Sequence, residues 1–241
     1  MHVLDDPAGL SERARAFLRR TGRREPDSVS RIPTDLLRVP DGSECMIPAP
    51  TELVVRREAF HARYGGLRYE VRRSALLGSG RYDGLRGLEF DLLDQVRPVG
   101  RSWGFSWSGE RVSSPVGFLV HTDGRVGVTD GGPFLEIAPS VPALIEGHAV
   151  MDLVSSWDPW PGGSLEPWVP SRAGVGMAER IEGLVAVPEA SGPTCAWLMS
   201  DHVAVHRFQG WVGRSPRPSA VQIWTRGEEG RRQVAAAMAA S

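Results

Sequence analysis

The sequence predicts an α+β protein with a mixed, mostly antiparallel sheet and flanking helices, followed by a smaller C-terminal α+β domain. Two observations lead to this prediction. Apolar residues alternate with a period of two over several stretches in the middle of the chain, and helix-like periods stand before and after them. The run 116–150 contains both patterns in succession and is the best specified local structure of the sequence.

The first part of this run predicts a three-stranded antiparallel meander. Asp123-Gly124 separates the alternating runs 116–121 and 126–128, and Asp and Gly tolerate the positive φ angles that tight hairpin turns require. A second glycine-rich break precedes a third strand pattern at 134–137.

The second part of the run predicts a helix that packs on the meander. Ser140 is placed to cap it, and Pro142 falls in the first turn, where a missing N–H costs little. The positions that share one helical face are Val141, Leu144, Ile145, His148 and Ala149.

The remaining elements follow from the same two periods. We expect helices over 7–21, with Asp6 as cap, from Thr51 to Gly65-Gly66, near Met177–Ile181, and over 228–239. The segment 22–50 is rich in proline and predicts an irregular connection with one helical turn near Thr34–Arg38. Strands are expected over 67–71, 85–93, 101–111, 184–187, 194–199, 202–208 and 220–225.

A segment without any structural period suggests a domain boundary. Residues 155–170 read SSWDPWPGGSLEPWVP, which is dense in Trp, Pro and Gly. We therefore predict a first domain over 1–155, a connector over 156–170 and a small second domain over 171–241. Because exposed tryptophans are costly, the connector is expected to lie packed, or to serve as the docking surface of a larger assembly.

Charge and cysteine content narrow the class of protein. All 28 basic residues are arginine, and 29 acidic residues leave a formal net charge of −1, so no nucleic-acid partner is expected. No run reaches the roughly 18 apolar residues of a membrane span. Cys45 and Cys195 are far apart and form no disulfide framework, which favours a reducing compartment. We expect a cytoplasmic protein without a membrane partner.

Two stretches of the predicted first domain carry a family resemblance. One runs from Ile47-Pro48 to Gly66, and the other, with the hairpin and the capped helix, runs from Phe118 to Ile145. In this order they resemble the SUKH superfamily, bacterial immunity proteins and fungal cell-wall regulators that share one α+β domain. The resemblance covers 1–155. It implies a non-catalytic binding protein, either an immunity factor that occludes a nuclease or deaminase toxin or a related regulatory scaffold, with no catalytic residues and no cofactor.

Acidic and aromatic residues are the candidates for contact with a protein partner. A cluster of carboxylates could face a basic toxin surface, although a solvated sheet edge is the ordinary interpretation of such a cluster. Aromatic residues at alternate positions of a strand indicate either core or interface. The predicted partner-binding residues are Asp83, Glu89, Asp91, Asp94, Trp103, Trp107 and Trp160.

The alternative from another class is a small hydrolase or metalloprotein. His202 and His206 would share one side of a strand, and with Cys195 they could form a Cys-His pair or bind a metal. Two histidines and one cysteine fall short of a closed zinc set. The main prediction therefore includes no catalytic residue, metal or cofactor.

Overall fold

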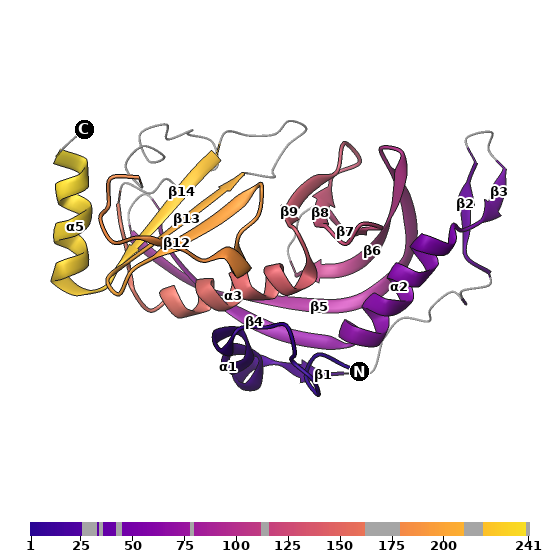
Figure 1. The fold of residues 1–241 in the computed structure, drawn as a ribbon, viewed down its shortest axis with the longest axis horizontal. Helices are drawn as coiled ribbons and strands as arrows, with labels where there is room; N and C mark the ends of the chain where they lie inside the picture. Colours follow the sequence, from indigo (N-terminus) through magenta and orange to yellow (C-terminus); the bar gives the residue numbers. More distant parts are fainter. Residues whose placement is uncertain are drawn as a thin grey trace. The chain divides into compact units, whose positions relative to one another are not determined.

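The computed structural model describes residues 1–25, 33, 36–41, 45–77, 80–111, 116–161, 179–209 and 219–239 (Figure 1). Its helices and mostly antiparallel strands confirm the α+β fold class. The chain divides into two compact units. Unit 1 comprises 1–70 and 87–136, and unit 2 comprises 71–86 and 137–241. These bounds differ from the predicted ones, because residues 71–86 and 137–155 group with the C-terminal part of the chain.

Unit 1 begins with a helix that is shorter than predicted. Helix α1 spans Glu12–Thr21, and its cap is Ser11 instead of Asp6. The Ser11 hydroxyl accepts a hydrogen bond from the Ala14 N–H, whereas the Asp6 carboxylate accepts one from Ala8 within the preceding turn. The hydroxyl thus satisfies one N–H of the first turn, which fixes where the helix starts.

Helix α2, Thr51–Tyr64, carries the aromatic core of unit 1. Phe60 projects from it to Phe105 and Trp107, with ring centroids 5.4 and 6.0 Å away. Phe90 joins the same cluster, with its ring centroid 4.7 Å from Trp107 and 6.3 Å from Phe60. Two of the alternate aromatic positions of the predicted strand, Phe105 and Trp107, therefore face the core of this unit, where they bury large apolar surfaces.

Seven strands form the main sheet, in the order β1-β4-β5-β6-β7-β8-β9. The predicted meander is confirmed as its last three neighbours. Strands β4 and β5 are longer than predicted, and each is divided between the two units. The bounds are β1 Arg23–Arg24, β4 Leu67–Leu77, β5 Gly80–Val99, β6 Ser102–Glu110, β7 Gly117–His121, β8 Val126–Thr129 and β9 Leu135–Ala138.

A separate hairpin replaces part of the irregular connection that the sequence predicts. Strands β2, Arg38–Pro40, and β3, Met46–Pro48, pair antiparallel as a two-stranded sheet. Val39 is buried, and Met46 and Ile47 are exposed. Residues 34–35 of the expected helical turn lie outside the described residues, and Arg38 belongs to a strand.

Unit 2 contains a second sheet with one face covered by a helix. Its strand order is β10-β14-β13-β12-β11. Helix α5, Gly227–Ala239, lies beside it (Figure 1), and Val234 packs with Val203, Val205, Val221 and Ile223. The strands at 194–199, 202–208 and 220–225 are confirmed. The bounds are β10 Asp158–Pro159, β11 Val185–Ala186, β12 Cys195–Met199, β13 Val203–Gln209 and β14 Ser219–Thr225.

The other face of this sheet carries tryptophans that contact helix α3, Val141–Val154, and strand β4. The Trp197 indole nitrogen lies 3.6 Å from the position that a side chain at Gly147 would occupy. Trp224 donates from its indole nitrogen to the backbone oxygen and hydroxyl of Ser74, at 3.2 and 3.1 Å. Both tryptophans are buried, so α3 and the part of β4 around Ser74 belong to the core of unit 2.

Helix α3 begins as the sequence predicts. The Ser140 hydroxyl accepts a hydrogen bond from the Ala143 N–H at 3.2 Å. Near its end, the buried Asp152 carboxylate accepts hydrogen bonds from the Arg72 backbone N–H and guanidinium, at 3.1 to 3.2 Å. Of the helix expected near Met177–Ile181, residues 177–178 lie outside the described residues, 179–180 form a turn, and Ile181 lies in a bend packed on the sheet.

Candidate functional site

The predicted acidic cluster is internally compensated in unit 1. Arg68 on β4 pairs with the buried Asp91 and lies 3.9 Å from Glu89. Arg111 donates to the same Glu89 carboxylate at 2.9 Å. Asp91 is only 2% exposed, so its predicted contact with a partner is wrong: its carboxylate points into the sheet and serves Arg68. Glu89 and Asp91 therefore present little uncompensated charge.

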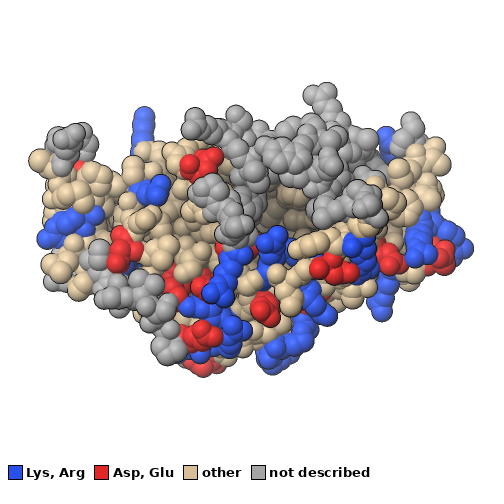
Figure 2. Space-filling model, turned by 180° about the vertical axis from the view of Figure 1, so that it is seen from behind, with Lys and Arg blue, Asp and Glu red and all other residues tan. Residues whose placement is uncertain are grey.

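The two more exposed members of the cluster also have arginine partners. Asp94 lies 3.6 Å from the buried Arg57 of unit 1. In unit 2, Arg81 donates to Asp83 at 2.8 Å, and this hydrogen bond raises the pKa of Arg81 above its usual value. Figure 2 shows arginine and acidic side chains interspersed over the described surface of one face. Compensation of this kind favours contact through mixed polar groups over a purely acidic patch.

The three predicted tryptophans occupy different environments. Trp107 is 1% exposed in the core of unit 1, so the prediction that it contacts a partner is wrong. The Trp107 ring packs against Phe60, Phe90 and Phe118. Exposing the indole to a partner would give up these contacts and the apolar surface that they bury. Trp103 is partly exposed. Trp160 is partly buried against the apolar cluster of unit 2, and its backbone N–H donates to the Ile223 carbonyl oxygen.

The alternative catalytic residues do not come together. Cys195 pairs with Phe208 in the β12–β13 ladder, and His206 pairs with Trp197. His202 lies in the turn at the opposite end of that hairpin, and at about 3.3 Å per residue it stands roughly 13 Å from His206. Within the described residues, no group of three or more His, Cys, Asp or Glu side chains could hold a metal ion.

His206 is instead part of an aromatic stack. Its ring lies parallel to that of Trp197, with centroids 4.1 Å apart, and Phe208 stacks at 4.9 Å. Burial lowers the pKa of His206 to about 3, with a smaller contribution from Arg73. Burial also lowers the pKa of His148 on α3 to about 3. Such weakly basic imidazoles are poor general bases at neutral pH.

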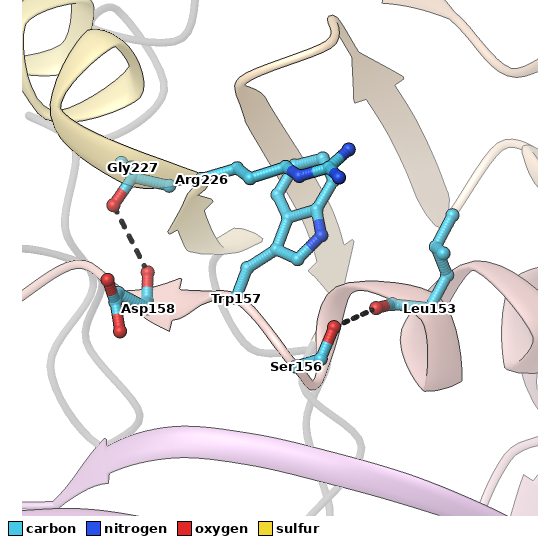
Figure 3. A pocket seen from close by; sticks show the side chains of 7 residues that line it. Leu153, Ser156, Trp157, Asp158, Arg226 and Gly227 are labelled. Carbon is cyan, nitrogen blue, oxygen red and sulfur yellow. Dashed lines mark hydrogen bonds between the residues drawn. The ribbon is translucent and has the colours of Figure 1, made fainter.

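The sequence analysis did not identify the pocket that the structure shows in unit 2 (Figure 3). It has a volume of about 270 Å³ and lies between the end of α3 and the start of α5. The segments that form it are far apart in the chain, so only Trp157, within the Trp-rich stretch, gave any signal. The lining residues are Leu153, Ser156, Trp157, Asp158, Thr225, Arg226 and Gly227.

Most polar groups of this pocket already have partners. Ser156 donates its hydroxyl hydrogen to the Leu153 carbonyl (Figure 3). The Thr225 hydroxyl donates to the Asp158 carbonyl. The Asp158 carboxylate accepts from Arg231 at 2.9 Å and lies 3.6 Å from Arg81. The hydrogen bond from Arg231 raises the pKa of that guanidinium. The negative charge in the pocket is therefore compensated.

Two donors in the pocket are left over. The exposed guanidinium of Arg226 has no hydrogen bond or ion pair to any residue that the structure describes. The indole N–H of the buried Trp157 has no acceptor among the same residues. Figure 3 shows the side chains of Arg226 and Trp157 among those that line the pocket. The pocket thus combines an apolar wall with free hydrogen-bond donors.

Comparisons outside the chain add no family assignment. In the described part of the chain, no helix is both long and apolar enough to cross a membrane. No protein-family model, curated protein or solved structure matches the chain.

Proposed function

We propose that the protein is a non-catalytic protein-binding module of the cytoplasm. In this proposal it acts as an immunity factor that neutralises a nuclease or deaminase toxin, or as a related regulatory scaffold. The single observation that carries the binding role is the pocket of unit 2, which brings Trp157, Arg226 and the exposed Leu153 to one place. Tryptophan and arginine are the residue types most enriched at the energetic centres of protein interfaces.

The cysteines fit the proposed compartment. Cys45 and Cys195 are both free thiols in the structure. The choice of an immunity role over another binding role rests on the resemblance of residues 47–66 and 118–145 to the SUKH superfamily.

Growth rescue tests the immunity role. Nuclease and deaminase toxin domains encoded in the genome of origin would be induced in a bacterial host, with and without this protein. We expect the protein to restore growth against one toxin and to form a stable complex with it in size-exclusion chromatography. Failure to neutralise or bind any of these toxins would contradict the immunity role.

Charge reversal at the pocket tests the proposed surface. Arg226→Glu should abolish both rescue and complex formation, because a central interface arginine is replaced by the opposite charge. The matched control is Arg232→Glu on α5, where the arginine is exposed and pairs with Glu229 of the same helix. Rescue that survives Arg226→Glu would place the interface elsewhere.

A further inference from the structure

We infer that the pocket of unit 2 binds the carboxylate of a ligand that also carries an apolar group. The site is that of the proposed function, and the inference names its ligand. Carboxylate binding is measurable without any partner protein, so the inference and the immunity role can fail separately.

Arg226 is the first reason to expect an anion. Its guanidinium lines the pocket and has no carboxylate partner within the described part of the chain. Two other arginines of unit 2 are paired by contrast: Arg81 with Asp83, and Arg231 with Asp158 and Glu228. A guanidinium presents its donors in a planar fork that matches the two oxygens of a carboxylate.

Trp157 is the second and independent reason. Only 8% of this residue is exposed, and its indole N–H has no acceptor among the described residues, although its backbone N–H and carbonyl are both hydrogen-bonded. The indole nitrogen is not among the fully buried, unpaired atoms of the described residues, so it reaches solvent and can donate a hydrogen bond to a ligand. Because Trp157 lines the same pocket as Arg226, one bound carboxylate could accept hydrogen bonds from both side chains.

The start of α5 adds to these donors. The helix spans Gly227–Ala239, and Gly227 lines the pocket. The first N–H groups of a helix have no intrahelical acceptor, and the helix dipole favours an anion at this end. The helix start therefore supports the anion site that Arg226 and Trp157 define.

Other features of the pocket restrict the kind of anion. Asp158 lines it, but Arg231 and Arg81 already balance its charge, and the single guanidinium of Arg226 matches a singly charged carboxylate better than a doubly charged phosphate. Leu153 supplies an apolar wall with 44% of its surface exposed. The volume of about 270 Å³ lies at the small end of ligand pockets, which span roughly 300–1,000 Å³. A carboxylate on one apolar residue fits these limits.

Such a carboxylate could belong to the C-terminal residue of a peptide or to a small free acid. The test uses the full chain labelled with 15N, whose eight tryptophans give indole N–H signals in a heteronuclear correlation spectrum. The probes are N-acetyl-leucine, its uncharged amide N-acetyl-leucinamide, and a pentapeptide ending in leucine with a free carboxylate. Trp157→Phe assigns the Trp157 signal.

We expect N-acetyl-leucine to shift the Trp157 indole signal at millimolar concentration and the amide to leave it in place. Arg226→Met should weaken binding about 10- to 100-fold, as expected for the loss of a charge-assisted hydrogen bond. Arg232→Met, the matched control, should bind like the unaltered chain. Tighter binding of the pentapeptide identifies a protein C-terminus as the natural ligand, and equal binding identifies a small acid.

Three results would overturn the inference: no movement of the Trp157 signal, equal binding of the acid and the amide, or unchanged binding by Arg226→Met. A chain that binds the acid but neutralises no toxin would retain the site and lose the immunity role. A chain that neutralises a toxin without binding the acid would retain the immunity role and lose the carboxylate site.

Discussion

Two partly buried histidines of unit 2, His148 and His206, show how position decides the chemistry of a residue. His206 was a candidate base or metal ligand because it lies four positions from His202 in the sequence. In the folded chain it is stacked between Trp197 and Phe208. Desolvation makes its charged form unfavourable, and Arg73 acts in the same direction. The residue is therefore an apolar packing element with a titratable ring.

This burial predicts a loss of stability in acid. The pKa of both His148 and His206 falls from 6.5 to about 3 on folding, so below pH 6.5 the unfolded chain binds protons that the folded chain does not. Stability is fully present above pH 6.5 and is lost as the pH falls toward 3. Linkage gives about 1.4 kcal/mol per histidine between pH 7.5 and 5.5.

Urea unfolding of the full chain and of His206→Phe at these two pH values measures the effect. Phenylalanine keeps the stack and removes the titration, so the difference in unfolding free energy between the two pH values should shrink by about 1.4 kcal/mol. An unchanged difference would show that His206 is protonated as easily in the folded as in the unfolded chain.

At the scale of elements, β6 meets β7 through a glycine that admits no side chain. Gly109 has a φ of +73°, and a Cβ placed on it would lie 2.1 Å from the ring of the buried Phe118. Gly131 also has a positive φ, +96°, but nothing lies within 4 Å of its Cβ position. A side chain at Gly131 would therefore meet backbone strain alone, whereas one at Gly109 would meet backbone strain and steric overlap.

We predict that Gly109→Ala destabilises the protein far more than Gly131→Ala. The second substitution costs only the left-handed backbone conformation, about 1–2 kcal/mol. The first adds overlap with a packed ring, for which overpacking penalties of about 1–3 kcal/mol are usual. Thermal unfolding of both variants measures the difference. Equal losses would mean that the Phe118 ring moves aside freely.

Local signals made some elements predictable and others not. Ser140 and Asp123-Gly124 act on their immediate neighbours, so the capped helix and the hairpin were read correctly from the sequence. The start of α1 was misplaced because Asp6 and Ser11 are both good caps, and only the fold decides between them. Strand β5 was predicted too short because its pairing with β6 shifts register on both sides of Leu92, which interrupts the alternation.

At the scale of the whole molecule, the pocket could not be found from the sequence because its two segments, 153–158 and 225–227, meet only through the fold. The same holds for the division into units. The sequence change at 155–170 suggested a boundary there, but α3 and the part of β4 around Ser74 pack on tryptophans at 197 and 224. A break in composition did not coincide with a break in packing.

This arrangement predicts that the fragment 1–155 folds only in part. It retains all of unit 1, yet α3 and the segment 71–86 lose the sheet that covers them. We expect strong amide protection against hydrogen exchange in β6–β8 and little in α3, whereas the full chain protects both. Full protection of α3 in the fragment would contradict the unit assignment and favour the predicted domain 1–155.

The hydrogen bonds between Trp224 and Ser74 also have a consequence during translation, because one partner is made long before the other. The two residues are 150 positions apart. At a translation rate of about 5–20 residues per second, Ser74 is synthesised roughly 7–30 s before its tryptophan partner. During that interval unit 1 can complete its core, while residues 71–86 remain an uncovered strand pair. Chaperones should therefore bind this segment in a nascent chain that is stalled before residue 219. They should dissociate once the stall is released and the chain is completed.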